Sequence, residues 1–227
     1  RIDKTPPTTY LQLPDYDKSA SDKKLFINMF RLFYDNNDPA TAQGLVQKHS
    51  DRWLVQNPPA ENLSTAELDE IYKLPFQLDQ HPYYQQHGPA RALDTIRFSI
   101  NTHRGCYGEC NFCAIAVHQG RTIQSRSKTS ILNEAKRMAE HPRFKGIIND
   151  VGGPTANMYG FECARKMAKG ACDHKRCMSS SICQTLKPTH KPQMDILRNL
   201  RAIEGVKKVF VSSGIRYDMV LEDERFG

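Results

Sequence analysis

The sequence of 227 residues lacks any apolar run of the roughly 18 residues that a membrane-spanning helix needs. It also lacks a Lys- or Arg-led apolar stretch of the kind found in signal peptides. We therefore expect a cytoplasmic protein without a membrane partner. Internal repeats and low-complexity tracts are absent too, and the length allows one domain or two small ones.

Cysteine is missing from residues 1–90, where 9 Lys and Arg stand against 12 Asp and Glu. Residues 91–227 hold all 7 Cys and carry 23 Lys and Arg against 13 Asp and Glu. An odd number of Cys in a chain without an export signal favours metal ligands or reactive thiols over a disulfide framework. We predict a division near residue 90, with the chemistry in residues 91–227.

Residues 1–90 are predicted to be a connector followed by a mixed, mainly helical segment. Residues 1–20 hold three prolines among polar residues, which is typical of an extended connector. Capping residues followed by helically spaced apolar residues predict helices over residues 22–37, 38–49 and 64–75. A short strand is expected at residues 52–56, and no catalytic group of residues is evident before residue 90.

Residues 91–227 alternate between strand and helix patterns. Strands are predicted over residues 95–101, 144–151 and 207–212. One helix is expected to be capped by Thr129 or Ser130. A second should start at Pro192, with one apolar face formed by Met194, Leu197 and Leu200. This order favours an α/β fold of parallel strands, whose carboxyl ends gather functional residues.

Cys106, Cys110 and Cys113 form the pattern C-x3-C-x2-C in one loop after the first of these strands. The loop must fold back tightly for the three thiolates to converge, and Gly105 and Gly108 permit this because they tolerate positive φ. Three thiolates leave a tetrahedral zinc site incomplete unless a nearby His joins them. They suit a four-iron cluster in which one iron position stays open.

The pattern C-x3-C, with an aromatic residue directly before the third Cys, resembles the radical S-adenosylmethionine (SAM) superfamily. Residues 97–106 and 120–127 more narrowly resemble the YgiQ-type uncharacterised radical SAM proteins. The resemblance is strong over residues 90–227 and weaker around residues 56–59 and 74–76. It implies an incomplete partial (β/α) barrel, since three strands are fewer than that superfamily uses.

The resemblance also implies a set of cofactor contacts. A four-iron four-sulfur cluster would be held by Cys106, Cys110 and Cys113, with SAM on the open iron. Reduction by one electron, from a partner such as flavodoxin or ferredoxin, would cleave SAM to methionine and a 5′-deoxyadenosyl radical that acts on an unidentified substrate. Phe112 would lie along the adenine. The SAM amino group would be received by the turn of Gly152, Gly153, Pro154 and Thr155.

Ser212, Ser213 and Arg216 follow the third predicted strand. In the superfamily this position commonly contacts the ribose and carboxylate of SAM. Arg suits a carboxylate because its guanidinium can bond both oxygens at once. The alternative is a solvated Arg216 in a surface turn.

A second group of Cys lies in a lysine-rich insertion near residues 160–190 and consists of Cys163, Cys172, Cys177 and Cys183. No C-x2-C pair occurs among them, which weakens a zinc interpretation, although His174 and His190 could complete a zinc site. Four Cys could also close an auxiliary iron–sulfur cluster. The third alternative is a set of unrelated thiols.

A radical SAM enzyme is the function that the sequence favours. Methylthiotransferase-like modification of RNA or protein is an alternative, but there the extra Cys normally precede the radical SAM Cys, and residues 1–90 have none. A zinc-containing basic RNA-binding module is an alternative from another class. Nucleic acid is not otherwise indicated, because the basic residues are mixed with acidic ones. We also expect the third strand to be an exposed edge and the chain alone to be poorly stable and weakly catalytic.

Overall fold

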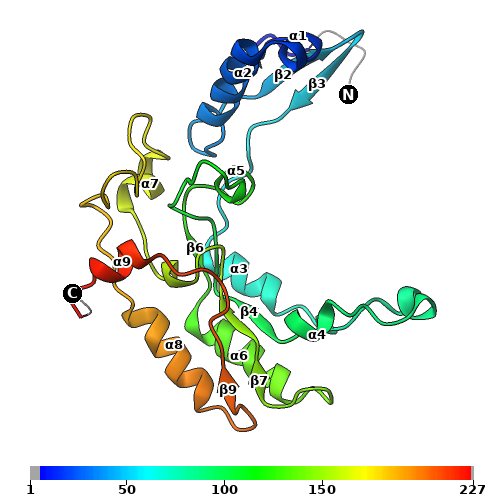
Figure 1. The fold of residues 1–227 in the computed structure, drawn as a ribbon, viewed down its shortest axis with the longest axis vertical. Helices are drawn as coiled ribbons and strands as arrows, with labels where there is room; N and C mark the ends of the chain where they lie inside the picture. The colour runs from blue at the N-terminus through cyan, green and yellow to red at the C-terminus, as the bar shows by residue number, and fades with distance from the viewer. Residues whose placement is uncertain (1–5, 226–227) are drawn as a thin grey trace.

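The computed structural model describes residues 6–225, which form an N-terminal unit and a larger core (Figure 1). In the N-terminal unit two helices accompany a small sheet, in which β1 is parallel to β2 and β2 is antiparallel to β3. The elements of this unit are β1 (Leu11–Gln12), α1 (Tyr16–Ser21), α2 (Lys23–Asp35), β2 (Leu45–His49) and β3 (Arg52–Gln56). The strand predicted at residues 52–56 is confirmed as β3.

Two predictions for this unit are wrong. Part of the expected connector forms β1 and α1, while its first five residues lie outside the described part of the chain. The helix predicted over residues 38–49 is replaced by β2, which pairs along its whole length with β3 across a turn where Ser50 has φ +53°. Leu45 and Val46 are buried in this arrangement. A short apolar pattern fits either element, and the pairing with β3 decides between them.

The other two predicted N-terminal helices are confirmed as α2 and α3 (Thr65–Tyr72). Asp22 begins α2, since its Oδ1 accepts the N–H groups of the second and third residues that follow it. At α3, Ser64 Oγ accepts the Glu67 N–H at 3.3 Å, and Glu67 Oε2 accepts the Ser64 N–H at 2.8 Å. This reciprocal capping box is the one expected from the sequence.

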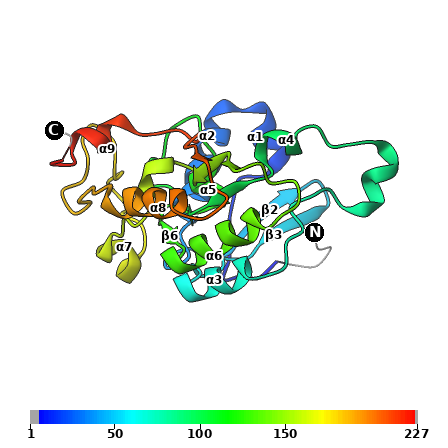
Figure 2. The same ribbon diagram turned by 90° about the horizontal axis from the view of Figure 1, so that it is seen from below.

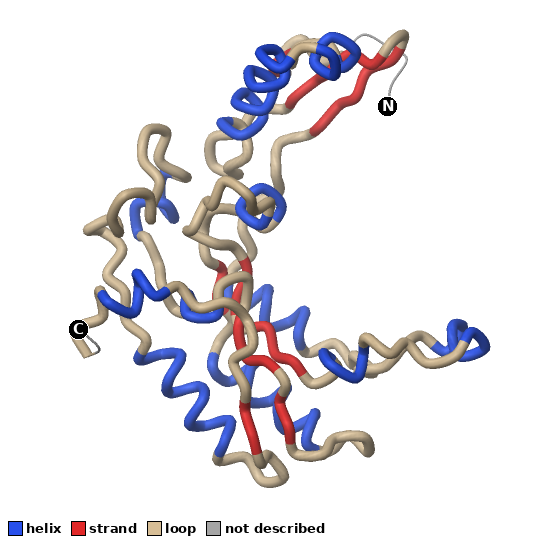
Figure 3. Tube along the Cα trace, viewed as in Figure 1, coloured by secondary structure: helices blue, strands red, loops and turns tan. Residues whose placement is uncertain are grey.

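The three core strands run parallel, as predicted. β4 (Ser99–Asn101) pairs with β8 (Asp150–Gly152), and β7 (Ile147–Ile148) pairs with β9 (Lys208–Val209). Because only Asn149 separates β7 from β8, this stretch lies between β4 and β9 (Figure 3). The strands are shorter than expected, and residues 93–96 form the helix α4 (Leu93–Ile96) instead of extending β4. Within residues 6–225, β9 has no strand on its outer side.

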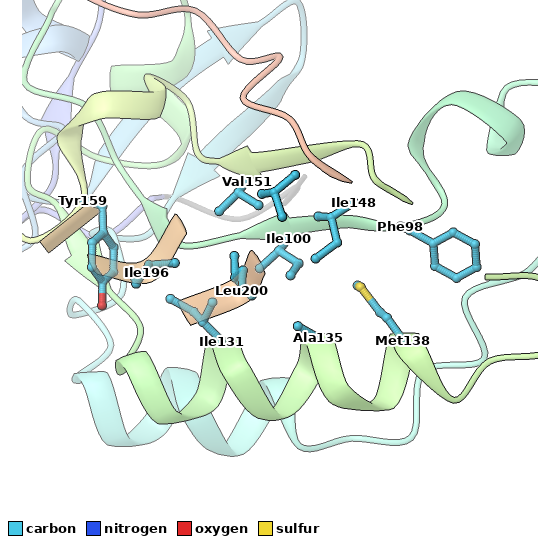
Figure 4. Packing of buried hydrophobic residues seen from close by; sticks show 11 residues of the cluster. Phe98, Ile100, Ile131, Ala135, Met138, Ile148, Val151, Tyr159, Ile196 and Leu200 are labelled. Carbon is cyan, nitrogen blue, oxygen red and sulfur yellow. The ribbon is translucent and has the colours of Figure 1, made fainter. Parts of the chain in front are cut away.

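Two helices, α6 (Lys128–Ala139) and α8 (Lys191–Arg201), pack on each other and on these strands. Figure 4 shows the shared core, which includes Phe98, Ile100, Ile131, Ala135, Met138, Ile148, Val151, Tyr159, Ile196 and Leu200. Burial of this apolar surface is the main force that holds the helices against the strands.

The cap of α6 and the buried face of α8 differ slightly from the prediction. The cap of α6 is Ser127, whose Oγ accepts the Ser130 N–H at 3.1 Å, rather than Thr129 or Ser130. The buried face of α8 consists of Gln193, Ile196 and Leu200, so Met194 and Leu197 lie beside the core-facing stripe. Gln193 is tolerated there because its Nε2 donates to Ala156 O at 2.7 Å.

The remaining elements connect these parts. An arm that contains the 3₁₀ helix η1 (Pro82–His87) and α4 extends away from the core (Figure 2). The other elements are β5 (His103–Arg104), α5 (Ile115–His118), β6 (Gln124–Ser125), η2 (Ala156–Met158), α7 (Ala164–Lys169) and α9 (Tyr217–Leu221). The fold is thus mixed α/β with small sheets, and no barrel closes within the described residues. In the same part of the chain, no helix has the length and apolarity to cross a membrane.

Candidate cofactor site

The loop with the first three Cys leaves β5 and leads into α5 (Figure 1). Gly105 has φ +81°, as expected, and a Cβ there would collide with the carbonyl oxygen of Thr122. Gly108 does not take a positive φ; Glu109 does, at +46°. The conformational freedom of Gly108 is therefore not used for a positive φ, and this glycine has a different role.

Two of the thiols converge on Gly108. A Cβ on Gly108 would lie 3.2 Å from Cys106 Sγ and 3.5 Å from Cys110 Sγ. The same point is 3.2 Å from Arg216 Nη1. The Gly108 N–H donates to Cys106 Sγ at 3.3 Å, and Arg216 Nη1 donates to Cys110 Sγ at 3.5 Å. A main-chain donor and a cation thus face two thiols.

Cys113 stands apart from this pair. Its N–H donates to Cys110 O at 2.9 Å, and the two side chains line a cavity of about 460 Å³. Among residues 6–225, no three Cys, His, Asp or Glu side chains lie close enough to share one ion. The donor set still fits a cluster, because three thiols share an eight-residue loop and two already meet beside a cation. Phe112, predicted along the adenine, is 92% exposed.

The turn after β8 lies beside Cys106, as the sequence predicted for this region. Thr155 Oγ1 is 3.4 Å from Cys106 Sγ, and Pro154 is half-buried in the same turn. A Cβ on Gly153 would lie 2.6–2.9 Å from three atoms of the His103 ring. Gly153 is therefore needed for the close approach of that ring.

Asp150, at the start of β8, holds the turn after β9, and the sequence analysis missed it. Its Oδ1 accepts the N–H groups of Ser212 and Ser213 at 2.8 and 3.1 Å, and its Oδ2 bonds to Ser213 Oγ. Ser212 Oγ donates to Asn149 O at 2.7 Å. A Cβ on Gly152 would lie 3.2 Å from Ser213 Oγ, so this glycine admits the serine. The available signal was an acidic residue two positions before a Gly-Gly pair at a strand end.

Arg216 lies at the cysteine loop rather than in a solvated turn. Its Nε donates to Asp218 Oδ1 at 3.1 Å, and its Nη2 pairs with Asp218 Oδ2. Its main chain is held by Asn157, whose Oδ1 accepts the Arg216 N–H at 2.9 Å and whose Nδ2 donates to Arg216 O at 3.0 Å. Asn157 also meets His190 Nε2 at 3.0 Å, and His190 Nδ1 lies 2.8 Å from Asp223 Oδ2. No motif in the sequence pointed to Asn157.

His103 is buried beneath this site as a neutral imidazole. Its Nδ1 lies 2.9 Å from Thr102 Oγ1, and that hydroxyl donates to Gly152 O at 3.1 Å. Because the hydroxyl has one proton, which Gly152 O accepts, Nδ1 carries a proton of the imidazole. Burial lowers the pKa of His103 to about 4.

Three Cys of the second group lie in an apolar cluster around Tyr107. Cys163 and Cys177 are buried there, and Cys183 packs at its margin. Burial raises the pKa of the Cys177 thiol. Lys166 is buried in the same place, with its Nζ 5.1 Å from the centre of the Tyr107 ring.

The fourth Cys of that group, Cys172, lies elsewhere. It lines the cavity beside the first cysteine loop, and Arg165 Nη1 bonds to its Sγ. Of the two His considered as zinc ligands, His174 lines the same cavity, whereas His190 is bonded to Asn157. The second group is therefore divided between two surroundings.

Residues of α2 line one side of this cavity. The sequence had indicated no catalytic group before residue 90. The Tyr34 hydroxyl donates to Glu109 Oε1 at 2.8 Å, and Arg121 Nη1 lies 3.4 Å from the same oxygen. Both Glu109 and Arg121 are buried. Burial, and then the bond to Glu109, raise the pKa of Tyr34 to about 12. Residues 1–90 thus contribute to the surroundings of the cysteine loop.

Known proteins resemble this chain over most of its length. Residues 2–99 match the Radical SAM N-terminal family model. The chain is 54% identical over 218 residues to a UPF0313 protein of Fusobacterium nucleatum, covering 96% of this chain and 38% of that protein. It is 46% identical over 217 residues to a UPF0313 protein of Methanosarcina mazei, covering 96% of this chain and 34% of that protein. A putative UPF0313 protein of Yersinia pestis is 44% identical over 219 residues, covering 96% and 28%.

Residues 2–99 therefore match a radical SAM family model, in agreement with the resemblance seen in the sequence. More narrowly, the chain is a homologue of the UPF0313 proteins, and it spans about a third of the length of the relatives it matches. The family model covers the residues before the cysteine loop, where the sequence analysis expected only a weak resemblance. The expected resemblance of these residues was therefore too narrow. The hydrogen bond from Tyr34 in α2 to Glu109 in the cysteine loop shows that they contact the candidate site.

Proposed function

We propose that this chain is the cluster-binding part of a radical SAM enzyme. In this proposal the cluster, of four irons and four sulfides, is held by Cys106, Cys110 and Cys113, and SAM binds to its open iron. The observation that carries the proposal is the meeting of Cys106 Sγ and Cys110 Sγ around Gly108, with a guanidinium beside them. The bound cluster and SAM would supply reductive cleavage of SAM to a 5′-deoxyadenosyl radical.

The surroundings of Cys106 suit a protected ligand. Cys106 is 9% exposed and packs with Tyr107 and Met158, and its Sγ is 3.8 Å from Met158 Sδ. Water is largely excluded from Cys106, so the Gly108 N–H acts on its sulfur atom in a medium of low dielectric constant. Thr155 brings a hydroxyl and a turn of main chain to the same sulfur, which supports the turn as the place for the SAM amino group.

The remaining parts of the proposal are the barrel, the electron donor and the substrate. The parallel strands would be the first part of a partial (β/α) barrel, and the outer side of β9 is where a further strand could pair. A one-electron donor such as flavodoxin or ferredoxin would supply the electron. The substrate stays unassigned, because the chain spans about a third of its relatives.

The number of irons per chain tests whether the second group of Cys takes part. We expect about four irons, because Cys172 lies in the cavity while the other three Cys of that group lie around Tyr107. About eight irons per chain would support the auxiliary cluster instead.

The reaction is tested by anaerobic incubation of the iron-loaded chain with SAM and dithionite, followed by chromatography of the products. The proposal predicts 5′-deoxyadenosine from the unmodified chain and from Cys172→Ala, and none above background from Cys106→Ala. The Cys172→Ala variant is the matched control, since it removes a thiol from the cavity wall and leaves the loop intact. Equal amounts of 5′-deoxyadenosine from the unmodified chain and Cys106→Ala would contradict the proposal.

A further inference from the structure

We infer that Arg216 acts on the Cys110 sulfur and sets the reduction potential of the cluster, rather than anchoring the carboxylate of SAM. This inference deepens the proposed function, and it rests on a cluster being held by the cysteine loop. It departs from the contact that the family resemblance implies for this position.

The guanidinium edge formed by Nε and Nη2 can bond two carboxylate oxygens, and Asp218 occupies it. Arg216 Nε donates to Asp218 Oδ1 at 3.1 Å, and Arg216 Nη2 pairs with Asp218 Oδ2. The pair holds the pKa of Asp218 below its usual value, chiefly through these hydrogen bonds. A SAM carboxylate that used this edge would have to displace an ionised partner, and one that used the other edge, of Nη1 and Nη2, would compete with Cys110 Sγ for Nη1.

The third nitrogen of the guanidinium, Nη1, is directed at the cysteine loop. It lies 3.5 Å from Cys110 Sγ and 3.2 Å from the point that a Cβ on Gly108 would occupy. Any side chain at Gly108 would thus crowd the arginine as well as both sulfur atoms. Because Gly108 has no side chain, the Arg216 guanidinium can reach the Cys110 sulfur.

The position of Arg216 is fixed by groups behind it. Asn157, which is 1% exposed, bonds both the N–H and the C=O of Arg216. Asn157 is in contact with His190, which is bonded to Asp223. Asn157 follows the turn of residues 152–155, so this clamp ties that turn to Arg216. With its main chain held by Asn157 and its guanidinium held by Asp218, Arg216 loses little freedom when it bonds to the sulfur.

A donor and a positive charge beside a cluster sulfur favour the more negative, reduced cluster. Hydrogen bonds to the sulfur atoms and local charge are recognised determinants of iron–sulfur potentials. Arg216 therefore raises the midpoint potential and eases reduction. Asp218 is 42% exposed and moderates this effect without removing it, because water screens the exposed carboxylate more than the half-buried guanidinium.

The test uses the iron-loaded chain without SAM, titrated with dithionite in the presence of redox dyes and followed by electron paramagnetic resonance. Arg216→Gln should give a midpoint potential more negative than that of the unmodified chain. The dissociation constant of SAM, measured on the oxidised protein, should change by less than about twofold. An unchanged potential together with a SAM dissociation constant raised about tenfold or more would overturn the inference and assign Arg216 to the carboxylate.

Two further variants complete the experiment. Arg198→Gln removes the same charge from the exposed side of α8 and should leave the potential unchanged. If Arg216→Gln does not retain iron, Arg216→Lys is measured instead, and it should shift the potential in the same direction by a smaller amount; no shift would overturn the inference. An unmodified chain that binds no iron would overturn the proposed function itself, which separates the two failures.

Discussion

The Tyr34 hydroxyl donates a hydrogen bond to Glu109 Oε1 at 2.8 Å, joining two residues that are 75 positions apart in the sequence. Glu109 lies between the first two Cys of the loop, and Tyr34 belongs to α2 of the N-terminal unit. Two further contacts join the N-terminal unit to other parts of the core: Asn37 Nδ2 donates to Val117 O in α5 at 3.0 Å, and the Ala171 N–H, after α7, donates to an Asp38 carboxylate oxygen at 3.0 Å. The N-terminal unit is thus attached directly to the cysteine loop.

Replacing Tyr34 by Phe should lower the free energy of unfolding by about 1–2 kcal/mol, because the buried Glu109 carboxylate loses its shorter hydrogen bond. Urea titration of the reduced chain measures the change. Tyr83→Phe is the control, since Tyr83 is 64% exposed in the arm. Equal unfolding free energies for Tyr34→Phe and the unmodified chain would show that the bond does not stabilise the fold.

Acid should destabilise the chain through His103. The pKa of His103 is lowered to about 4 by burial, whereas an unfolded His titrates near 6.5. Between these values the unfolded chain binds the extra proton and the folded chain does not, so stability falls as the pH drops from about 7 to about 4. The loss is of the order of 3 kcal/mol. Urea titrations across this range should show a weaker dependence for His103→Gln, whereas His87→Gln in the arm should retain it.

Adding a methyl group at Gly153 should force the His103 ring out of place. A Cβ there would lie 2.6–2.9 Å from the ring, so Gly153→Ala should lower the free energy of unfolding by about 2 kcal/mol. The double variant His103→Ala/Gly153→Ala should be more stable than the sum of the two single effects predicts, by about 1 kcal/mol or more. Strict additivity in a double-mutant cycle would mean that the ring is not what restricts residue 153.

Arg126 joins α3 to the core and should be among the most sensitive positions. Its Nη1 donates to Asn101 O at 2.8 Å and pairs with Glu134, and its guanidinium lies 3.6 Å from the Tyr72 ring. Arg126→Met should lower the free energy of unfolding by about 3 kcal/mol, since it leaves a buried carboxylate unpaired. The loss should be smaller at pH 5 than at pH 7, because Glu134, whose pKa burial already raises, can then be protonated. Arg201→Met, on the exposed side of α8, should have little effect at either pH.

Local signals in the sequence predicted much of the fold. The capping residue Asp22, the capping box at Ser64, and the alternation of strands with α6 and α8 were read correctly because neighbouring residues alone determine them. The segment of β2 was misread because its pairing with β3 outweighs its helical spacing. The core strands proved shorter than their apolar patterns, and α4 replaces the start of the first one.

The candidate site could be predicted where a single short motif defines it. The cysteine spacing located the loop, and the strand order placed Gly153 and Thr155 beside it. The contacts of Asn157 with Arg216 and of Tyr34 with Glu109 could not be predicted, since they join residues that are 59 and 75 positions apart and follow from packing. The four later Cys were also predicted as one group, but the fold separates Cys172 from the other three.

Metal analysis of the anaerobically reconstituted chain shows directly whether the first cysteine loop holds an iron–sulfur cluster. We expect a brown protein with about four irons and four sulfides per chain. Cys106→Ala, Cys110→Ala and Cys113→Ala should each lose most of the iron, whereas Cys172→Ala should retain it. A colourless protein that binds zinc alone, or a Cys106→Ala variant with undiminished iron, would contradict the account.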